Sequence, residues 1–116
     1  MIINRLIYVT FQKEGIHCYP AAPDNVEFLK HPHRHIFHFR VTLSVTHNDR
    51  DVEFILFKRE LESLYSDGAM LMNYKSCEML GEELIEYISN KYPNRQIQVE
   101  VSEDGENGAI ISYSPS

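Results

Sequence analysis

The segment from His33 to His47 constrains the fold most, because every second side chain belongs to a set that is mainly apolar and the others are mainly polar. One set begins with histidines and continues with apolar residues: His33, His35, Phe37, Phe39, Val41, Leu43 and Val45. The intervening set is mostly polar, with Arg34, His38, Arg40, Thr42, Ser44 and Thr46. Successive side chains of a strand point to opposite faces of a sheet. The alternation therefore predicts a long strand with one face toward a core.

The residues before this strand divide into two parts. Residues 3–11 are rich in β-branched and aromatic side chains and predict a first strand. Residues 12–32 contain several glycine, proline and asparagine turn formers and predict a long loop. Loops of this length inside a compact domain are usually functional or mobile. Its position directly before the histidines makes this loop a candidate part of a site.

Two helices are expected in the middle of the chain. Residues 55–65 have apolar side chains at helical spacing, and the run Ser66-Asp67-Gly68 should end that helix. Ser76 is a good N-cap for a second helix, which Pro93 and Asn94 should close. The expected inward face of the second helix comprises Met79, Leu80, Leu84, Ile85 and Ile88. A short methionine-rich connection joins the two helices.

The C-terminal residues predict a pair of strands. Residues 96–101 alternate between polar and apolar side chains, which predicts a strand. Residues 104–108 are of the types found in hairpin turns, and residues 109–113 should form the last strand. The element order is thus ββααββ, which predicts an α+β fold. A chain of 116 residues with 43% hydrophobic content lies within the range of one domain, so residues 1–116 are expected to form a single domain.

The composition narrows the set of partners and compartments. A net charge of −6 without a cluster of Lys and Arg argues against nucleic-acid and anionic-membrane binding. No apolar stretch approaches the ~20 residues that a membrane helix requires. Cys18 and Cys77 are far apart in the sequence, and the N-terminus lacks a basic segment followed by an apolar run. We therefore expect a cytoplasmic protein.

The histidines are the first candidate site. His31, His33 and His35 alternate with other residues, so in a strand they project to one side, with neighbours ~6.6 Å apart at the backbone. Two such imidazoles can share one metal ion, and a catalytic zinc ion takes three protein ligands and water. His17 is the candidate for the third ligand. The alternative is that these histidines are ordinary polar surface residues, the reading we favour for His38 and His47.

Glu103 is the second candidate site residue, because it follows the strand of residues 96–101. A carboxylate there could accept two parallel hydrogen bonds from the N–H pair that guanine and pterin rings both present. The alternative is an acid that solubilises a turn in an acidic protein.

Together these motifs resemble the 6-pyruvoyl-tetrahydropterin synthase and 6-carboxytetrahydropterin synthase family over nearly the whole chain. The resemblance lies in the shared order of short motifs: His17 after Phe11, His33-Arg34-His35-Ile36-Phe37, Glu53-Phe54 with Phe57-Lys58, Ser76-Cys77-Glu78-Met79-Leu80, and Val99-Glu100-Val101-Ser102-Glu103. It implies a tunnelling fold, in which a four-stranded antiparallel sheet carries two helices on one face. Copies of this fold assemble into an oligomeric barrel with sites between subunits.

The resemblance also implies site roles. His17, His33 and His35 would hold zinc, and Glu103 would anchor a pterin-like or purine-like ring. The overlapping His31-Pro32-His33 leaves open whether His31 replaces His35 as a ligand. Two departures bear on catalysis. Arg34 replaces the middle glycine of the family's His-Gly-His motif, and the family's cysteine and acid–base relay have no evident counterpart. The expectations are therefore a zinc enzyme of this type or a non-catalytic module that sequesters a nucleotide-derived ligand, with a purely structural oligomer ranked last.

Overall fold

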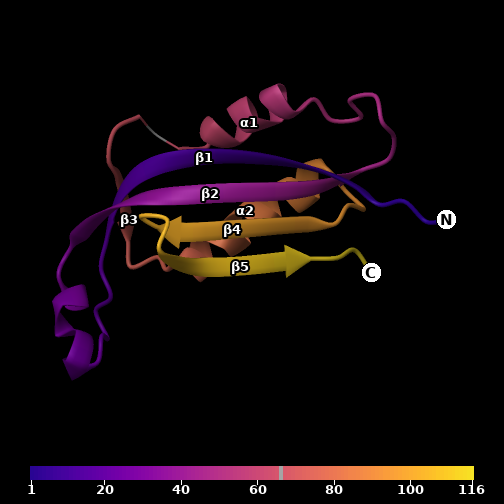
Figure 1. Cartoon of the computed structure of the whole chain (residues 1–116). Coiled ribbons are helices and arrows are strands. Elements are labelled where there is room, and N and C mark those ends of the chain that lie inside the picture. Colours follow the sequence, from indigo (N-terminus) through magenta and orange to yellow (C-terminus); the bar gives the residue numbers. More distant parts are fainter. Residues whose placement is uncertain (66) are drawn as a thin grey trace.

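A computed structural model describes residues 1–65 and 67–116 and has an α+β architecture (Figure 1). Within these residues, one five-stranded sheet carries two α-helices, and a 3-10 helix lies in a connection. The strands are β1 (Arg5–His17), β2 (His33–Val45), β3 (Met70–Asn73), β4 (Ile97–Glu103) and β5 (Asn107–Tyr113). The helices are η1 (Asp24–Lys30), α1 (Phe54–Glu62) and α2 (Cys77–Lys91).

The strand order across the sheet is β3-β1-β2-β4-β5. The pairings are antiparallel except that of β1 with β3, which is parallel. The expected count of four antiparallel strands was therefore wrong, because the methionine-rich connection forms β3. This short strand pairs with residues 15–17 at the end of β1. Four residues of mixed exposure carry too little periodicity to be read as a strand from the sequence.

Strand β1 is longer than its sequence pattern predicts. It pairs with β2 from Arg5 opposite Val45 to His17 opposite His33. The expectation of a loop from Gln12 onward was wrong, because the ladder to β2 supplies backbone hydrogen bonds to residues 12–16 whatever their side chains. This extension brings His17 beside the first histidine of β2.

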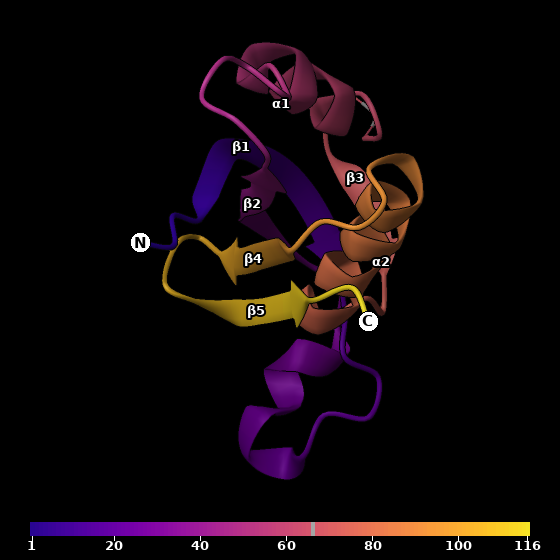
Figure 2. The same ribbon diagram turned by 90° about the vertical axis from the view of Figure 1, so that its right-hand side faces the viewer.

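The alternation of β2 is confirmed. Phe37, Phe39, Val41 and Leu43 are buried on one face of the sheet. Both α-helices contribute to the same core, α1 over β1 and α2 over β4 and β5 (Figures 1 and 2). The buried helix residues are Phe57 and Leu61 of α1 and Cys77, Leu80, Gly81, Leu84, Ile85 and Ile88 of α2. Met79, expected on the inward face, is 45% exposed, so that assignment was wrong.

Both α-helices begin with a side-chain cap. The Glu53 carboxylate accepts hydrogen bonds from the backbone N–H groups of Ile55 and Leu56. The Ser76 hydroxyl accepts one from Met79, as its sequence position predicts. Helix α1 ends at Glu62, earlier than expected, and Ser66 of the expected stop signal lies outside the described residues.

Between β1 and β2 the chain makes an excursion away from the sheet, visible at the lower left of Figure 1. It contains η1, and its base is closed by a hydrogen bond from the Tyr19 N–H to the Leu29 carbonyl, 2.7 Å long. The chain re-enters the sheet at His33, so the excursion places both ends of the connection beside the histidines.

The sheet has open edges in the described part of the chain. Residues 5–14 of β1 and the outer side of β5 carry no neighbouring strand there. Exposed apolar side chains accompany these edges, among them Leu6 and Tyr8 on β1 and Ile110 on β5. Unpaired edges of this kind invite pairing with another chain. Among the described residues, no helix has the length and apolar character needed to cross a membrane.

An ion pair between Asp51 and Arg95 ties the connection after β2 to the segment before β4. Arg95 donates hydrogen bonds of 2.8 and 3.4 Å to the two carboxylate oxygens, and the Thr46 backbone N–H donates another of 2.8 Å. The Arg95 hydrogen bond, followed by that from Thr46, holds the pKa of Asp51 well below its usual range.

This ion pair should make stability depend on pH. A carboxyl group whose pKa is lowered by folding stabilises the protein fully above its ordinary value near 3.8, and that stabilisation is lost as the pH falls. We expect Asp51→Asn to lower the urea concentration at the midpoint of unfolding at pH 7. Between about pH 4 and pH 2 this midpoint should fall less steeply in the variant than in wild type. Asp49→Asn, which removes an exposed pair with Arg50, is the control and should change neither. Parallel pH curves for wild type and Asp51→Asn would contradict this role.

Candidate metal centre

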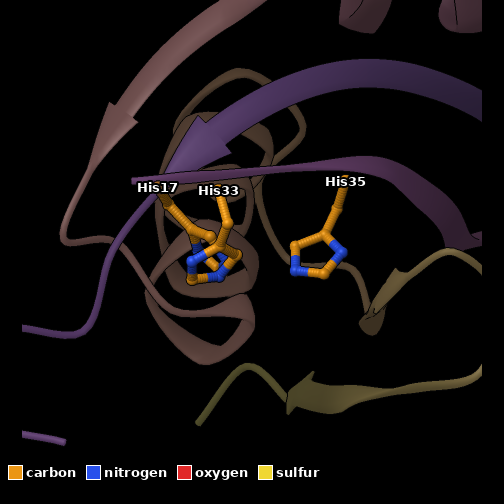
Figure 3. Close-up of side chains that lie close together, drawn as sticks. All are labelled: His17, His33 and His35. Atoms are coloured by element: carbon orange, nitrogen blue, oxygen red, sulfur yellow. The ribbon is translucent and has the colours of Figure 1, made fainter. Parts of the chain in front are cut away.

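Three histidines converge at the end of the sheet where β1 finishes and β2 begins (Figure 3). His17 and His33 are opposite one another in the β1–β2 ladder, and His35 follows two residues later on the same face. One ligating atom from each ring lies within 4.8 Å of the others. Ring centroids are 4.6 Å apart for His17 and His33, 4.9 Å for His33 and His35, and 5.3 Å for His17 and His35. These side chains form the histidine cluster.

Each ring of the histidine cluster is oriented by a hydrogen bond at Nδ1. The His17 Nδ1 lies 2.9 Å from the Lys75 carbonyl oxygen, and the His33 Nδ1 lies 2.8 Å from that of His31. The His35 Nδ1 lies 2.7 Å from the Asp104 carboxylate. Because these oxygens are acceptors, the hydrogen of each neutral ring sits on Nδ1 and leaves Nε2 with a free lone pair.

The free nitrogens fit a metal ion. The Nε2 atoms of His17 and His35 are buried and have no hydrogen-bond partner among the described residues. Buried polar atoms in folded proteins are nearly always satisfied, so two orphaned nitrogens in one cluster call for an explanation. Metal-ligating histidines characteristically use one nitrogen for the metal and donate the other N–H to an oxygen, as all three do here. The cluster could therefore hold a metal ion.

The histidine cluster packs against an apolar side chain, which we call its Phe37 floor. Phe37, two residues after His35 on β2, is fully buried and packs edge-on against both rings. Its centroid is 5.1 Å from that of His17 and 6.0 Å from that of His35. His17 is only 8% exposed. Apolar packing on this side limits the positions that the rings can take, and it lowers the local dielectric constant around a bound ion.

The end of β4 brings two carboxylates to the same place. Glu103 pairs with Phe37 across the sheet, and its carboxylate lies 3.2 Å from the Nε2 of His17. Asp104 begins the turn to β5 and accepts hydrogen bonds from the Ile36 backbone N–H and from His35. These two hydrogen bonds, that of Ile36 first, lower the pKa of Asp104, so it is an ionised acceptor for the ring.

A cavity of about 500 Å³ adjoins the histidine cluster. It lies where β1 ends, α2 begins and β4 turns into β5. Its lining includes His17, Cys18, Tyr19, Leu29, His33, Tyr74, Lys75, Ser76, Cys77, Glu78, Met79, Glu103, Asn107 and Gly108. Small-molecule sites typically enclose about 300–1,000 Å³, so this space suits a ring-sized ligand.

The Cys77 thiol in this cavity is a poor nucleophile. Burial raises its pKa to about 11, and the charges of Glu103 and Glu78 act in the same direction. Reactive cysteines instead sit in electropositive surroundings that favour the thiolate. Cys77 is therefore suited to packing at the start of α2.

Another open cavity, of about 540 Å³, has a different character. It involves the polar face of the sheet and α1, and its lining carries charges of both signs, including Arg40, Lys58, Glu62 and Glu100. The group of metal-ligating side chains found in the described residues lies elsewhere, at the histidine cluster. We therefore place the candidate site at the cavity beside the histidines.

The structure brings together the four residues that the sequence singles out, His17, His33, His35 and Glu103. His31 is exposed and lies outside the histidine cluster, where it contributes its carbonyl oxygen to His33. Two supporting groups, Asp104 and the Lys75 carbonyl, were missed. Asp104 could have been suspected from its place beside Glu103 in the turn, whereas a backbone carbonyl leaves no signal in the sequence.

Gly108 is required for the hairpin that positions Glu103. A Cβ at this position would lie 2.1 Å from the Val101 carbonyl oxygen and 2.6 Å from the Ser102 Cα. Both are backbone atoms, which cannot move without disturbing the hairpin. We expect Gly108→Ala to cost about 3 kcal/mol or more in urea denaturation. Gly68→Ala has a positive φ of 75° but nothing within 4 Å, and it should cost about 1 kcal/mol. Equal, small losses in both variants would contradict this requirement.

Comparisons with protein-family models and with curated proteins found no match for the chain. The function proposed below therefore depends on the geometry and on the sequence resemblance.

Proposed function

We propose that this chain is a zinc-binding protein of the 6-pyruvoyl-tetrahydropterin synthase type, which binds a pterin, a purine or a related nucleotide-derived ligand at subunit interfaces. The observation that carries the proposal is the histidine cluster, in which all three Nδ1 atoms are hydrogen-bonded and one ligating atom of each ring lies within 4.8 Å of the others, beside a cavity. On this proposal the fold is a tunnelling fold to which β3 has been added.

Zinc is a metal that suits these ligands. Three imidazole nitrogens with borderline-soft character favour zinc over magnesium and calcium, which prefer oxygen ligands. His17, His33 and His35 would hold the ion, and when bound it would act as a Lewis acid on an oxygen of the ligand. The buried position of His17 and the Phe37 floor would keep bulk water away from that side of the ion.

Glu103 is proposed to anchor the ring of the organic ligand. Its side chain lines the cavity and is 31% exposed, so it is reachable from that space. An ionised carboxylate accepts two parallel hydrogen bonds from the adjacent N–H groups of a guanine or pterin edge. Tyr19, Leu29, Tyr74 and Met79 in the same lining offer apolar contact to a flat ring.

Homo-oligomer formation is proposed from the edges of the sheet. Residues 5–14 of β1 and the outer side of β5 present unpaired backbone groups among the described residues. Pairing of the β1 edge of one copy with the β5 edge of another would give these backbone groups hydrogen-bond partners. If each copy repeats this head-to-tail contact, the copies form a closed ring. Exposed Leu6, Tyr8 and Ile110 on these strands favour such contacts.

A second candidate function is a non-catalytic module that sequesters a nucleotide-derived ligand, for example a viral protein that binds a nucleotide signal. It is favoured by Cys77, whose pKa of about 11 makes it unsuited to nucleophilic or acid–base chemistry in the cavity. It is also favoured by residues 27–30, Glu-Phe-Leu-Lys, which supply no cysteine before the histidines. Glu27 is exposed on η1 and is the acidic group of that stretch.

Calorimetry with zinc-loaded protein tests the proposed function. Pterins, guanine derivatives and cyclic nucleotides are titrated in turn, and the recovered ligand is analysed by mass spectrometry. Binding with an altered product supports the enzyme, whereas binding with the ligand recovered intact supports the sequestering module. Failure of every ring compound to bind would contradict both.

A further inference from the structure

The carboxylate of Glu103 lies against the two buried nitrogens of the histidine cluster. Its Oε1 is 3.2 Å from the Nε2 of His17, and its Oε2 is 3.5 Å from the Nε2 of His35. Neither nitrogen makes a hydrogen bond within the part of the chain that the structure describes. These close polar contacts therefore need a different physical cause.

The tautomers of the two rings make the contacts unfavourable unless a cation lies between the atoms. The His17 Nδ1 faces the Lys75 carbonyl and the His35 Nδ1 faces the Asp104 carboxylate, so both Nδ1 atoms carry hydrogen. The Nε2 atom of each neutral ring then presents a lone pair to a negatively charged oxygen. Such atoms attract each other only through a shared proton or a shared metal ion, and among the described residues neither nitrogen has the hydrogen-bond partner that a shared proton would require.

The distances match those of a metal site. Two ligands about 2.0–2.1 Å from a tetrahedral zinc ion lie about 3.3 Å apart. The separations of 3.2 Å for Oε1 and His17 and 3.5 Å for Oε2 and His35 fall on either side of this value, with one carboxylate oxygen facing each ring.

We propose that Glu103 supplies a fourth ligand to the metal ion held by His17, His33 and His35 when no organic ligand is bound. This inference rests on the metal site of the proposed function and not on the identity of the organic ligand. A carboxylate bound to the metal cannot at the same time accept both N–H groups of a ring. A ring held through both N–H groups, as in the proposed function, would therefore displace Glu103 from the metal and would open a coordination position.

Titration with Co²⁺ alone tests this role, because cobalt reports its coordination in its visible absorption. Wild type is compared with Glu103→Gln, Glu103→Asp and the control Glu106→Gln, an exposed acid of the same turn. We expect both Glu103 variants to bind Co²⁺ about 10–100-fold more weakly and with an altered spectrum. Glu106→Gln should match wild type. The aspartate keeps the charge but is one methylene too short to reach the ion.

The outcomes separate this inference from the proposed function. Wild-type affinity and spectrum in Glu103→Gln would overturn the fourth ligand and leave the three-histidine site standing. Full recovery in Glu103→Asp would also overturn it, because the carboxylate would then act through its charge alone. Failure of wild-type protein to bind Co²⁺ would overturn both the metal site and the fourth ligand.

Discussion

Replacing His33 and His35 together with alanine is expected to abolish metal binding. The double variant leaves His17 as the one imidazole of the histidine cluster, and a single imidazole cannot hold zinc against water at micromolar concentration. We expect the zinc content after dialysis to fall from about one ion per chain to near zero. Competition with a chromophoric chelator measures the loss.

The control for this variant is His31→Ala with His38→Ala. These residues belong to the same segment but lie outside the histidine cluster, and alanine at position 31 keeps the carbonyl that orients His33. The control should retain the wild-type zinc content. A His33→Ala, His35→Ala variant that keeps its full metal content would show that the site lies elsewhere. Zinc content should also fall as the solution is acidified, because protonated imidazole cannot bind a metal.

Replacing Glu103 with alanine is expected to reduce affinity for the organic ligand sharply. Two N–H groups of the bound ring edge would lose their charged acceptor and remain buried without partners. Such a loss costs roughly 1–3 kcal/mol or more, which corresponds to about a 5- to 150-fold weaker Kd. Glu103→Gln should be nearly as damaging, because the amide offers one acceptor oxygen and one misplaced donor.

Calorimetry at saturating zinc isolates this effect from any change in metal affinity. Glu106→Gln is the matched control, since it removes a charge from the same turn without touching the cavity lining. It should bind the ligand as wild type does. Equal affinity in wild type, Glu103→Ala, Glu103→Gln and Glu106→Gln would show that Glu103 is a solvated turn residue, and the pterin-type assignment would lose its main support.

The long strand and its core face could be predicted from the sequence because alternation over many residues has one physical solution. Phe37, Phe39, Val41 and Leu43 are buried as that pattern requires. The start of α2 at Ser76 was also predictable, because its cap is local chemistry. By contrast, residues 12–16 and 70–73 are strands because of their neighbours. Their own side chains do not mark them as such, so the extended β1 and the added β3 could not be predicted.

The candidate site was predictable in its residues but not in its geometry. His-x-His spacing places two rings on one face, yet the choice among His31, His33 and His35 depends on the register that sets His17 opposite His33. The approach of Glu103 to the same rings depends on its pairing with Phe37, a contact between residues far apart in the chain. Long-range register of this kind is fixed by the packed sheet and not by local sequence.

X-ray absorption at the zinc edge of purified wild-type protein tests the central claim most directly, since it reports both the amount of metal and its ligands. The account predicts about one zinc ion per chain, with imidazole nitrogens at about 2.0–2.1 Å. A protein that takes up no zinc when it is supplied would contradict the account. So would sulfur scattering at about 2.3 Å, which would assign the metal to Cys18 or Cys77 instead of the histidine cluster.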